Sequence, residues 1–373
     1  MQALNGLTAQ AAPQKDSAGC KALSLAEYYE NRIDPAATLL GRRFLCREGG
    51  LLFVGPSGVG KSSASVQQDV CWALGRPAFG IEPARPLRIL CVQAENDAGD
   101  MHEMAQGVID GLKLTAADRE ALRERTRYAS QKACTGQAFF DVLRHLLESY
   151  KPDLVRIDPL QAYLGGDPKD SALISWFCRE SLNPLLEQYG AAAIVNHHTP
   201  KTNFRETATW KPSDWMYAGA GAADLTNWAR AVLVIDPSGG DTRGLYRFIA
   251  AKRGGRIGWR NKEDEPIYER HFQHARESGA IYWEDADAPA RGTRHIPTKE
   301  ELLALVPEDE PIRKDALTSK AASAGIGEKK VRGFIGELLG DGKLHEWTER
   351  RPRVRPVALV SRQPQREQMV FEP

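Results

Sequence analysis

The sequence lacks the segments that would direct a protein into or across a membrane. No uncharged apolar run approaches the roughly 20 residues needed to span a bilayer, and residues 1–20 have no basic start followed by an apolar core. The six cysteines form no C-x-x-C pair, which argues against a zinc site and favours reduced structural thiols. These absences predict a cytoplasmic protein with no membrane partner.

An excess of either charge is also missing from the chain as a whole, because 50 Lys and Arg against 49 Asp and Glu leave a net charge of +1. One segment of the chain nevertheless carries an excess of positive charge. Residues 311–366 contain 13 Lys and Arg against 6 Asp and Glu, a charge of +7. A basic end on a neutral chain indicates contact with a polyanion.

Between residues 26 and 285, apolar runs of strand character alternate with helical patterns. This alternation predicts an α/β fold, with a mostly parallel sheet sandwiched by helices. The last strands follow one another without helices, so the sheet should finish antiparallel. The predicted strands are 51–55, 87–94, 126–130, 153–158, 191–196, 231–236 and 245–251, and the predicted helices are 61–74, 98–112, 137–150, 171–189 and 218–229.

The segments outside this α/β region have different patterns. Residues 1–25 are rich in Ala, Gln, Gly and Ser and should be flexible, 286–297 read as a linker, and 366–373 form a tail. Residues 298–365 contain helical patterns at 298–305, 313–324 and 327–339, then strand-like runs at 344–348 and 356–360. Three helices and a β-hairpin predict a small winged helix-turn-helix domain that binds DNA or a protein partner.

A glycine-rich motif follows the first strand of the α/β region. Residues 55–62 fit the pattern G-x-x-x-x-G-K-[ST] between an apolar run and a helix, a context that a chance turn would lack. Backbone N–H groups and the helix dipole at such a turn bind phosphates, the lysine reaches the β- and γ-phosphates, and the hydroxyl binds Mg²⁺. The predicted ATP and Mg²⁺ site comprises Gly55, Pro56, Ser57, Gly58, Val59, Gly60, Lys61, Ser62 and Ser63.

Two carboxylates end other strands of the predicted sheet. Asp158 follows an apolar run, where a strand delivers a carboxylate to the metal; the alternative is an ordinary strand-terminal Asp before Pro159. Hydrolysis also needs a base for the attacking water, and Glu95 ends the strand after the glycine-rich motif. The segment around Glu95 could instead begin a helix capped by Asp97, and both roles can hold because they use different residues.

A histidine pair, His197 and His198, ends the strand predicted at 191–196. Adjacent residues of a strand point to opposite faces, so the two rings cannot easily share a metal ion. One of them is expected to contact the γ-phosphate or the attacking water, and the alternative is a packed histidine without such a role.

In their order along the chain, these motifs resemble those of RecA-like ATPases, in particular the RepA-type replicative helicases of plasmids, phages and mobile elements. The resemblance covers about residues 35–255 and also includes Ala229-Arg230-Ala231-Val232. The sequence departs from the plasmid helicase in its C-terminal extension and in the loop after the histidine pair. The roles implied by position are phosphate binding by Lys61, Mg²⁺ binding by Ser62 and Asp158, catalysis by Glu95, and nucleotide sensing by His198 or His197.

Such ATPases form homo-oligomers, hexameric rings or filaments, in which a neighbour inserts an arginine finger. Arg230 matches the place of that finger, with Lys252 and Arg253 as a second cationic pair. A cation is needed where charge builds up in the transition state. The alternative for Arg230 is a residue in a surface salt bridge.

Nucleic acid is the expected partner. In RecA-like rings, the loops after the strand that ends in Asp158 and after the strand that ends in the histidine pair face the channel; here these are 165–169 and 201–221. Cations and aromatic side chains in these loops suit single-stranded DNA. The alternative for the second loop is a lid that folds over ATP or packs on its neighbour. In the C-terminal domain, duplex DNA would meet a helix and a wing. The candidate contacts are Lys201, Arg205, Trp210, Lys211 and Trp215 in the loop, and Lys329, Lys330, Arg332, Arg351 and Arg353 in the C-terminal domain.

Together these features predict an enzyme, a Mg²⁺-dependent P-loop ATPase that translocates on, unwinds or remodels DNA during replication of a plasmid, phage or mobile element. One alternative is an ATP switch without helicase activity, such as a recombination mediator. Another is a DNA-binding regulator whose P-loop domain only supports oligomerisation.

Overall fold

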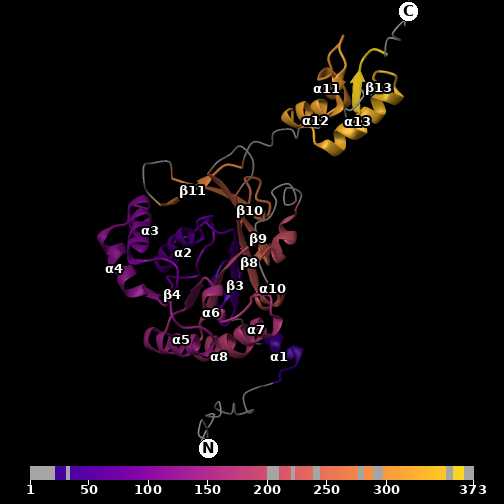
Figure 1. Ribbon diagram of the computed structural model, residues 1–373. Coiled ribbons are helices and arrows are strands. Elements are labelled where there is room, and N and C mark those ends of the chain that lie inside the picture. The colour runs from indigo at the N-terminus through magenta and orange to yellow at the C-terminus, as the bar shows by residue number, and fades with distance from the viewer. Residues whose placement is uncertain are drawn as a thin grey trace, which may run out of the picture. The chain divides into compact units, whose positions relative to one another are not determined.

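The computed structural model describes residues 22–30, 34–199, 210–219, 223–237, 244–275, 281–288, 297–349 and 356–364. The chain divides into two compact units, Met1–Ala288 and Pro289–Pro373. The first unit is built around a nine-stranded sheet with the order β11-β10-β9-β8-β3-β7-β6-β4-β5 (Figure 1). Its strands are β3 (Gly50–Gly55), β4 (Ile89–Gln93), β5 (Thr126–Ser130), β6 (Leu154–Asp158), β7 (Ala192–His198), β8 (Ala231–Pro237), β9 (Leu245–Lys252), β10 (Glu269–His274) and β11 (Trp283–Ala286).

Parallel pairing joins six of these strands. The central strand β3 pairs in parallel with β7 and β8, β6 pairs in parallel with β7 and β4, and β4 pairs in parallel with the edge strand β5. Antiparallel pairing then adds β9, β10 and β11 beyond β8. The structure therefore confirms the expected α/β sheet, which is mostly parallel and finishes antiparallel.

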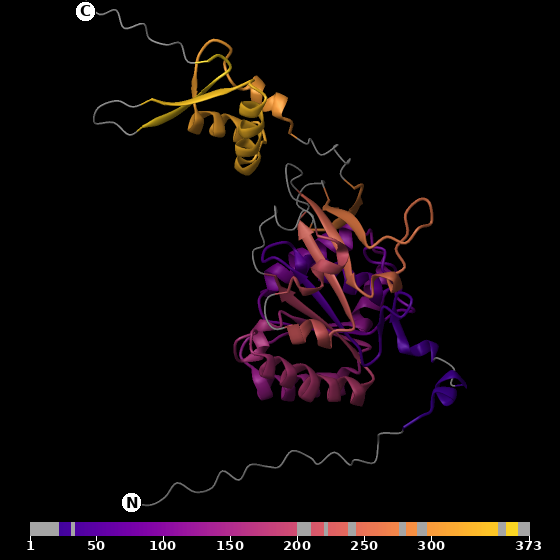
Figure 2. The same cartoon turned by 90° about the vertical axis from the view of Figure 1, so that its right-hand side faces the viewer.

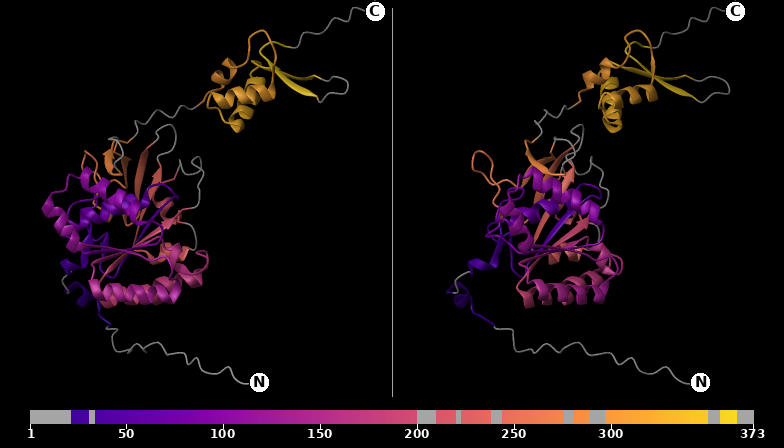
Figure 3. Two further views of the ribbon diagram at one scale, coloured as in Figure 1. Left: turned by 60° about the vertical axis from the view of Figure 1, so that its left-hand side comes forward. Right: turned by 90° about the vertical axis from the view of Figure 1, so that its left-hand side faces the viewer.

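Alternate residues of the buried strands supply two hydrophobic cores, one on each face of the sheet. In β3, Leu51 and Phe53 belong to one core, whereas Leu52 and Val54 belong to the other. The helices form a layer over each face (Figures 2 and 3). The first core contains side chains of α2 (Lys61–Ala73), α3 (Ala98–Gly111) and α4 (Ala116–Arg125), and the second contains side chains of α5 (Gly136–Tyr150), α6 (Gln161–Leu164), α7 (Ser171–Ser175), α8 (Asn183–Tyr189) and α10 (Ala223–Trp228).

Several elements differ from the sequence-based expectation. Helix α4 was not predicted, although its Thr115–Asp118 capping box marks its start. A π-helical segment, Trp176–Leu182, interrupts the helix expected at 171–189, and Pro184, which has no N–H for the helical ladder, follows it at the start of α8. Short elements also occur: α1 (Leu25–Glu30), β1 (Thr38–Leu40), β2 (Leu45–Cys46), and 3-10 helices at Pro35–Ala37, Pro212–Tyr217 and Gly254–Arg256.

The second unit has a hydrophobic core of its own, made by side chains of its helices and strands. Its three strands pair antiparallel in the order β12-β14-β13. Its elements are α11 (Lys299–Ala304), β12 (Ile312–Arg313), α12 (Lys314–Ser323), α13 (Glu328–Gly340), β13 (His345–Glu349) and β14 (Val357–Ser361). In the described parts of both units, no helix has the length and apolar character that spanning a bilayer requires.

Helix α3 approaches the chain at the start of β11 through two glycines. A Cβ on Gly107 would lie 2.5 Å from the backbone nitrogen of Ile281, and a Cβ on Gly111 would lie 2.4 Å from the ring of Tyr282. Contacts this short are sterically forbidden, so the two segments can pack this closely only because both helix positions lack a side chain. This contact holds the antiparallel extension of the sheet against α3.

Replacing Gly107 by Ala should therefore destabilise the protein, although alanine is the better helix former. We expect the free energy of unfolding, measured by urea denaturation, to fall by about 1–3 kcal/mol, as overpacking of a core does. Gln106→Ala, at the neighbouring exposed position of the same helix, is the control and should change it by less than about 0.5 kcal/mol. Equal stability of the two variants would contradict this packing.

Candidate nucleotide site

The glycine-rich motif forms an open turn between β3 and α2. Gly58 and Gly60 both adopt left-handed backbone conformations, with φ of +75° and +89°, which a residue with a Cβ adopts only with strain. Ser57 and Gly58 are exposed, and a Cβ on Gly58 would meet no atom within 4 Å. The turn is therefore a cradle of accessible backbone at the start of a 13-residue helix, which is the arrangement that binds phosphates.

The side chain of Lys61 lies across this cradle and is buried. Its Nζ donates to the carbonyl oxygens of Gly55 and Pro56, at 2.8 Å each, and lies 3.1 Å from Nδ1 of His198. Burial lowers the pKa of Lys61 to about 8, although the carboxylates of Asp158 and Glu95 act in the opposite direction. A buried ammonium group held by neutral carbonyl groups is poised to bind an anion.

A hydroxyl and a carboxylate meet beside Lys61. Ser62 Oγ donates to Oδ2 of Asp158 at 3.3 Å. Burial raises the pKa of Asp158, while Asn196, Arg156 and Lys61 lower it. Mg²⁺ prefers oxygen ligands, so this pair fits the metal that a triphosphate carries, and a cation there would offset the cost of burying the carboxylate.

Glu95 and His198 complete the group from two further strand ends. The side chain of Glu95 is 56% exposed, and its Oε1 lies 3.9 Å from Nε2 of His198. Burial and the nearby Lys61 lower the pKa of His198, so its ring is neutral at pH 7. Because Lys61 can only donate, Nδ1 accepts from it, and Nε2 then carries the ring proton, on the side of Glu95.

The structure shows the helix cap expected at Asp97, and it places Glu95 beside His198. Asp97 caps α3 and forms a capping box with Asp100, while Glu95 lies near the cradle. The Gln93 side chain shapes the turn between them, because it bonds both the N–H and the carbonyl of Asn96. Of the two histidines, His197 is fully buried, so His198 is the one beside Lys61.

A buried polar network behind the site was not predicted. Arg156, with no exposed surface, pairs with Asp69 of α2 at 2.6 Å and donates to the side chains of Gln68 and Asn196. The Asn196 amide donates in turn to Ser65 of α2. The network therefore links the helix after the cradle to the strands that carry Asp158 and His198. The available signal was an arginine in the middle of the apolar run 154–157.

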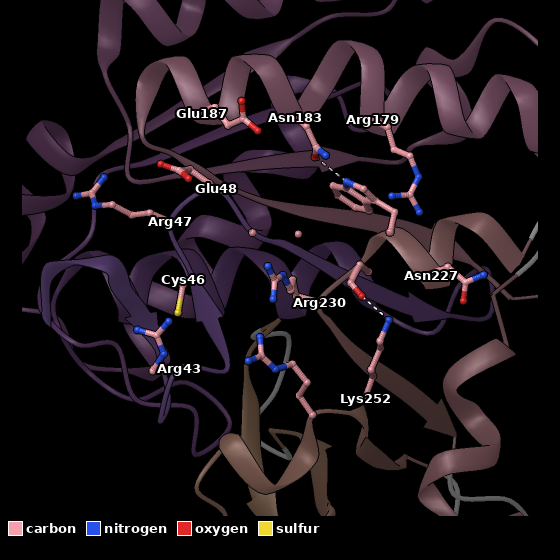
Figure 4. A pocket seen from close by; sticks show the side chains of 15 residues that line it. Arg43, Cys46, Arg47, Glu48, Arg179, Asn183, Glu187, Asn227, Arg230 and Lys252 are labelled. Carbon is pink, nitrogen blue, oxygen red and sulfur yellow. Dashed lines mark hydrogen bonds between the residues drawn. The ribbon is translucent and has the colours of Figure 1, made fainter. Parts of the chain in front are cut away.

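A cationic pocket of about 740 Å³ lies at the opposite end of the sheet. Figure 4 shows Arg230 near its middle, with Arg43 and Lys252 on either side. Burial and the neighbouring guanidinium groups lower the pKa values of Lys252 and Arg253. The cations that line the pocket outnumber its two carboxylates, Glu48 and Glu187, and they are Arg43, Arg47, Arg179, Arg230, Lys252 and Arg253.

Strained backbone surrounds this pocket. Arg43, Glu48 and Arg253 have φ values of 63°, 63° and 57°, which are uncommon for residues with a side chain. Such strain persists where the surrounding structure imposes it, often at functional sites. The pocket therefore combines strained backbone with mutually repelling cations, and both features suit the binding of an anion.

The predicted DNA contacts are only partly described. Lys201, Arg205, Arg351 and Arg353 lie outside the described residues. Lys211, Lys329, Lys330 and Arg332 are exposed, and Arg332 pairs with Glu328. The expectation that Trp215 stacks on a base is wrong, because this side chain is 3% exposed; it packs against the half-buried Trp210, with ring centroids 5.0 Å apart.

Comparison with protein families gives one match. A family model described as an AAA domain matches residues 15–203, just over half of the 373-residue chain. The matched segment includes the cradle, Glu95, Asp158 and His198, and it ends before β8. A search of curated proteins found no match.

The buried Arg156–Asp69 pair yields a prediction about stability. Arg156→Met should lower the free energy of unfolding by about 3–5 kcal/mol, because it leaves the Asp69 carboxylate buried without its cation. The double variant Asp69→Leu/Arg156→Met should recover part of this loss, and chemical denaturation measures both. Arg123→Met, which breaks the exposed pair with Glu120, is the control and should cost less than about 1 kcal/mol. Similar losses for Arg156→Met and Arg123→Met would contradict the prediction.

Proposed function

The chain belongs to the AAA-domain family, and from this membership and the site geometry we propose that it is a Mg²⁺-dependent ATPase acting on DNA. It would assemble with copies of itself and use hydrolysis to translocate on, unwind or remodel DNA during replication of a plasmid, phage or mobile element. The observation that carries the proposal is the meeting of Lys61, Ser62, Glu95, Asp158 and His198 at one edge of the sheet.

Each of these side chains suits a separate task. Lys61 and the backbone N–H groups of the cradle would hold the phosphates, and Ser62 and Asp158 would hold Mg²⁺, which neutralises phosphate charge. The exposed carboxylate of Glu95 can accept the proton of an attacking water, a contribution of about 10²–10⁴-fold. His198 contacts both Lys61 and Glu95 and is therefore placed to respond to the γ-phosphate.

The cationic pocket supports a homo-oligomer. The Arg230 N–H donates to the carbonyl of Gly50, at the start of β3, whereas Lys61 contacts Gly55, at its end. Five residue steps of about 3.3 Å separate the two ends by roughly 17 Å. Arg230 therefore cannot serve the nucleotide of its own chain from this position. As an arginine finger it would act on a neighbouring copy, with Lys252 and Arg253 beside it.

Mixing two inactive variants tests this arrangement. Glu95→Gln removes the base and Arg230→Ala removes the finger, so each alone should lose about 10²-fold or more in phosphate release. A 1:1 mixture should regain activity, because an Arg230→Ala copy keeps Glu95 and receives Arg230 from a Glu95→Gln neighbour. Random assembly would restore about a quarter of the sites, each with the finger and the base that phosphoryl transfer needs.

A mixture of Lys61→Ala and Glu95→Gln is the control, since both changes fall in the same site and no combination repairs it. Recovery in the control mixture, or none in the first, would contradict a finger supplied by a neighbour. A wild-type protein without turnover above that of Lys61→Ala, with single-stranded DNA present, would contradict the ATPase. A strand-displacement assay then separates a helicase from an ATP switch.

The second unit supports binding to duplex DNA. Its order of helices and strands suits a winged helix, in which α13 would enter a groove. Lys329, Lys330 and Arg332 are exposed on the first turns of α13, where they can reach phosphates or base edges. The charge of +7 over residues 311–366 also favours contact between this part of the chain and a polyanion.

The salt dependence of DNA binding tests this surface. In the full-length protein, Lys329→Ala/Lys330→Ala should weaken duplex binding and reduce the slope of log K against log salt by about 1.8, because two phosphate contacts are lost. The matched control is Lys299→Ala/Lys314→Ala, which removes two lysines already paired with Asp341 and Glu346. Equal slopes for the two double variants, measured by fluorescence anisotropy, would contradict the prediction.

A further inference from the structure

Three aromatic side chains gather on the antiparallel extension of the sheet. Tyr246 comes from β9, His274 from β10 and Trp283 from β11. The ring centroid of His274 lies 4.0 Å from that of Trp283 and 5.3 Å from that of Tyr246. We call these three rings the aromatic ledge. All three lie outside residues 15–203, which the AAA-domain model matches.

The aromatic ledge is bonded to the helix that follows the phosphate cradle. Trp283 Nε1 donates to Ser63 Oγ at 3.0 Å. The backbone N–H and carbonyl of Trp283 both bond the side chain of Gln67, at 2.8 and 2.9 Å. These three hydrogen bonds hold β11 on the first turns of α2, although 216 residues separate Gln67 from Trp283.

The ledge begins where the cradle ends. A Cβ placed on Gly60 would lie 2.8 Å from the Trp283 ring and 3.4 Å from Cε1 of His274. The last glycine of the cradle is thus the point where the phosphate-binding backbone and the aromatic rings meet. Any larger residue at position 60 would collide with the indole ring.

The direction of a bound triphosphate follows from the order of the strands. Asp158 ends β6, His198 ends β7, and Glu95 follows the end of β4. These three strands all lie on one side of β3. These residues and the Lys61 ammonium mark the γ-phosphate end. The ledge comes from β9, β10 and β11, on the other side of β3. A triphosphate with its γ-phosphate at Glu95 would therefore direct its nucleoside toward the ledge.

Exposure distinguishes the three rings. Trp283 is 2% exposed and acts as a support, whereas Tyr246 and His274 are only half-buried. No carboxylate among the described residues pairs with His274. Burial lowers its pKa, so the ring is neutral at pH 7. Neutral aromatic rings bind the flat face of a base by stacking.

We propose that Tyr246 and His274 form the nucleoside subsite of this protein, on which the base of the bound nucleoside triphosphate stacks. The subsite depends on the proposed function, since it presumes a triphosphate in the cradle. Every base has a π-face, so stacking alone discriminates little between bases. The ledge should therefore strengthen binding of ATP and GTP to a similar degree.

Inorganic tripolyphosphate separates this subsite from the cradle, because it carries the phosphates without a nucleoside. Using calorimetry in the presence of Mg²⁺, we expect His274→Ala to raise the Kd for ATP by about 5- to 150-fold, the range measured for loss of one stacking partner. The Kd for tripolyphosphate should stay within about twofold, because the cradle that binds the phosphates is unchanged. His274→Phe keeps an aromatic ring and should bind ATP almost as well as the wild type, and Tyr246→Ala should follow His274→Ala.

His271→Ala is the matched control, because His271 is a half-buried histidine of the same strand on its other face. It should leave both Kd values unchanged. Equal weakening of ATP and tripolyphosphate in His274→Ala would mean a distorted cradle and would overturn the subsite, as would an unchanged Kd for ATP. If the wild-type protein bound neither probe more tightly than Lys61→Ala does, the proposed function itself would fail, which is a different result from loss of the subsite alone.

Discussion

The register between parallel strands brings the nucleotide site together. Gly55 of β3 pairs with His198 of β7, and Asp158 of β6 pairs with Gln93 of β4. Parallel strands end at the same edge of a sheet, so residues far apart in the sequence meet there without long loops. A shift of one residue in β7 would turn His198 away from Lys61 and direct its neighbour there instead.

Arg156 and Asp69 connect this edge to the helix that follows the cradle. Burying two charges is costly, and apolar residues of similar volume often give equal or greater stability. What the ion pair adds is geometry, because the guanidinium also bonds Gln68 and Asn196, on α2 and β7. The spacing between the cradle and the strand carboxylate is thereby held by directional bonds, which apolar packing does not provide.

Whether the sequence predicts a part of this arrangement depends on how far apart in the sequence the contacting residues lie. Gly55–Ser62 was identifiable because the cradle is formed by consecutive residues between a strand and a helix. Glu95 and Asp158 followed from strand ends, since the edge of a parallel sheet gathers such residues. The sequence alone does not show which of His197 and His198 points toward Lys61, because this depends on the pleat of β7 in the structure. Trp215 looked like an exposed loop aromatic, but tertiary packing buries it. The contact between Trp283 and Gly60 joins segments with no shared pattern, so no local signal indicated it.

The two ends of the sheet restrict how copies of this chain could share a catalytic site. A twofold interface buries the same patch on both copies, whereas the cradle and Arg230 lie at opposite ends of β3. If Arg230 serves a neighbouring nucleotide, the carboxyl edge of one sheet must face the amino edge of the next, which is a head-to-tail contact. Such contacts repeat until they close into a ring, and otherwise they continue as a filament. The rotation between neighbours therefore decides between the two assemblies, and the same finger geometry is compatible with either.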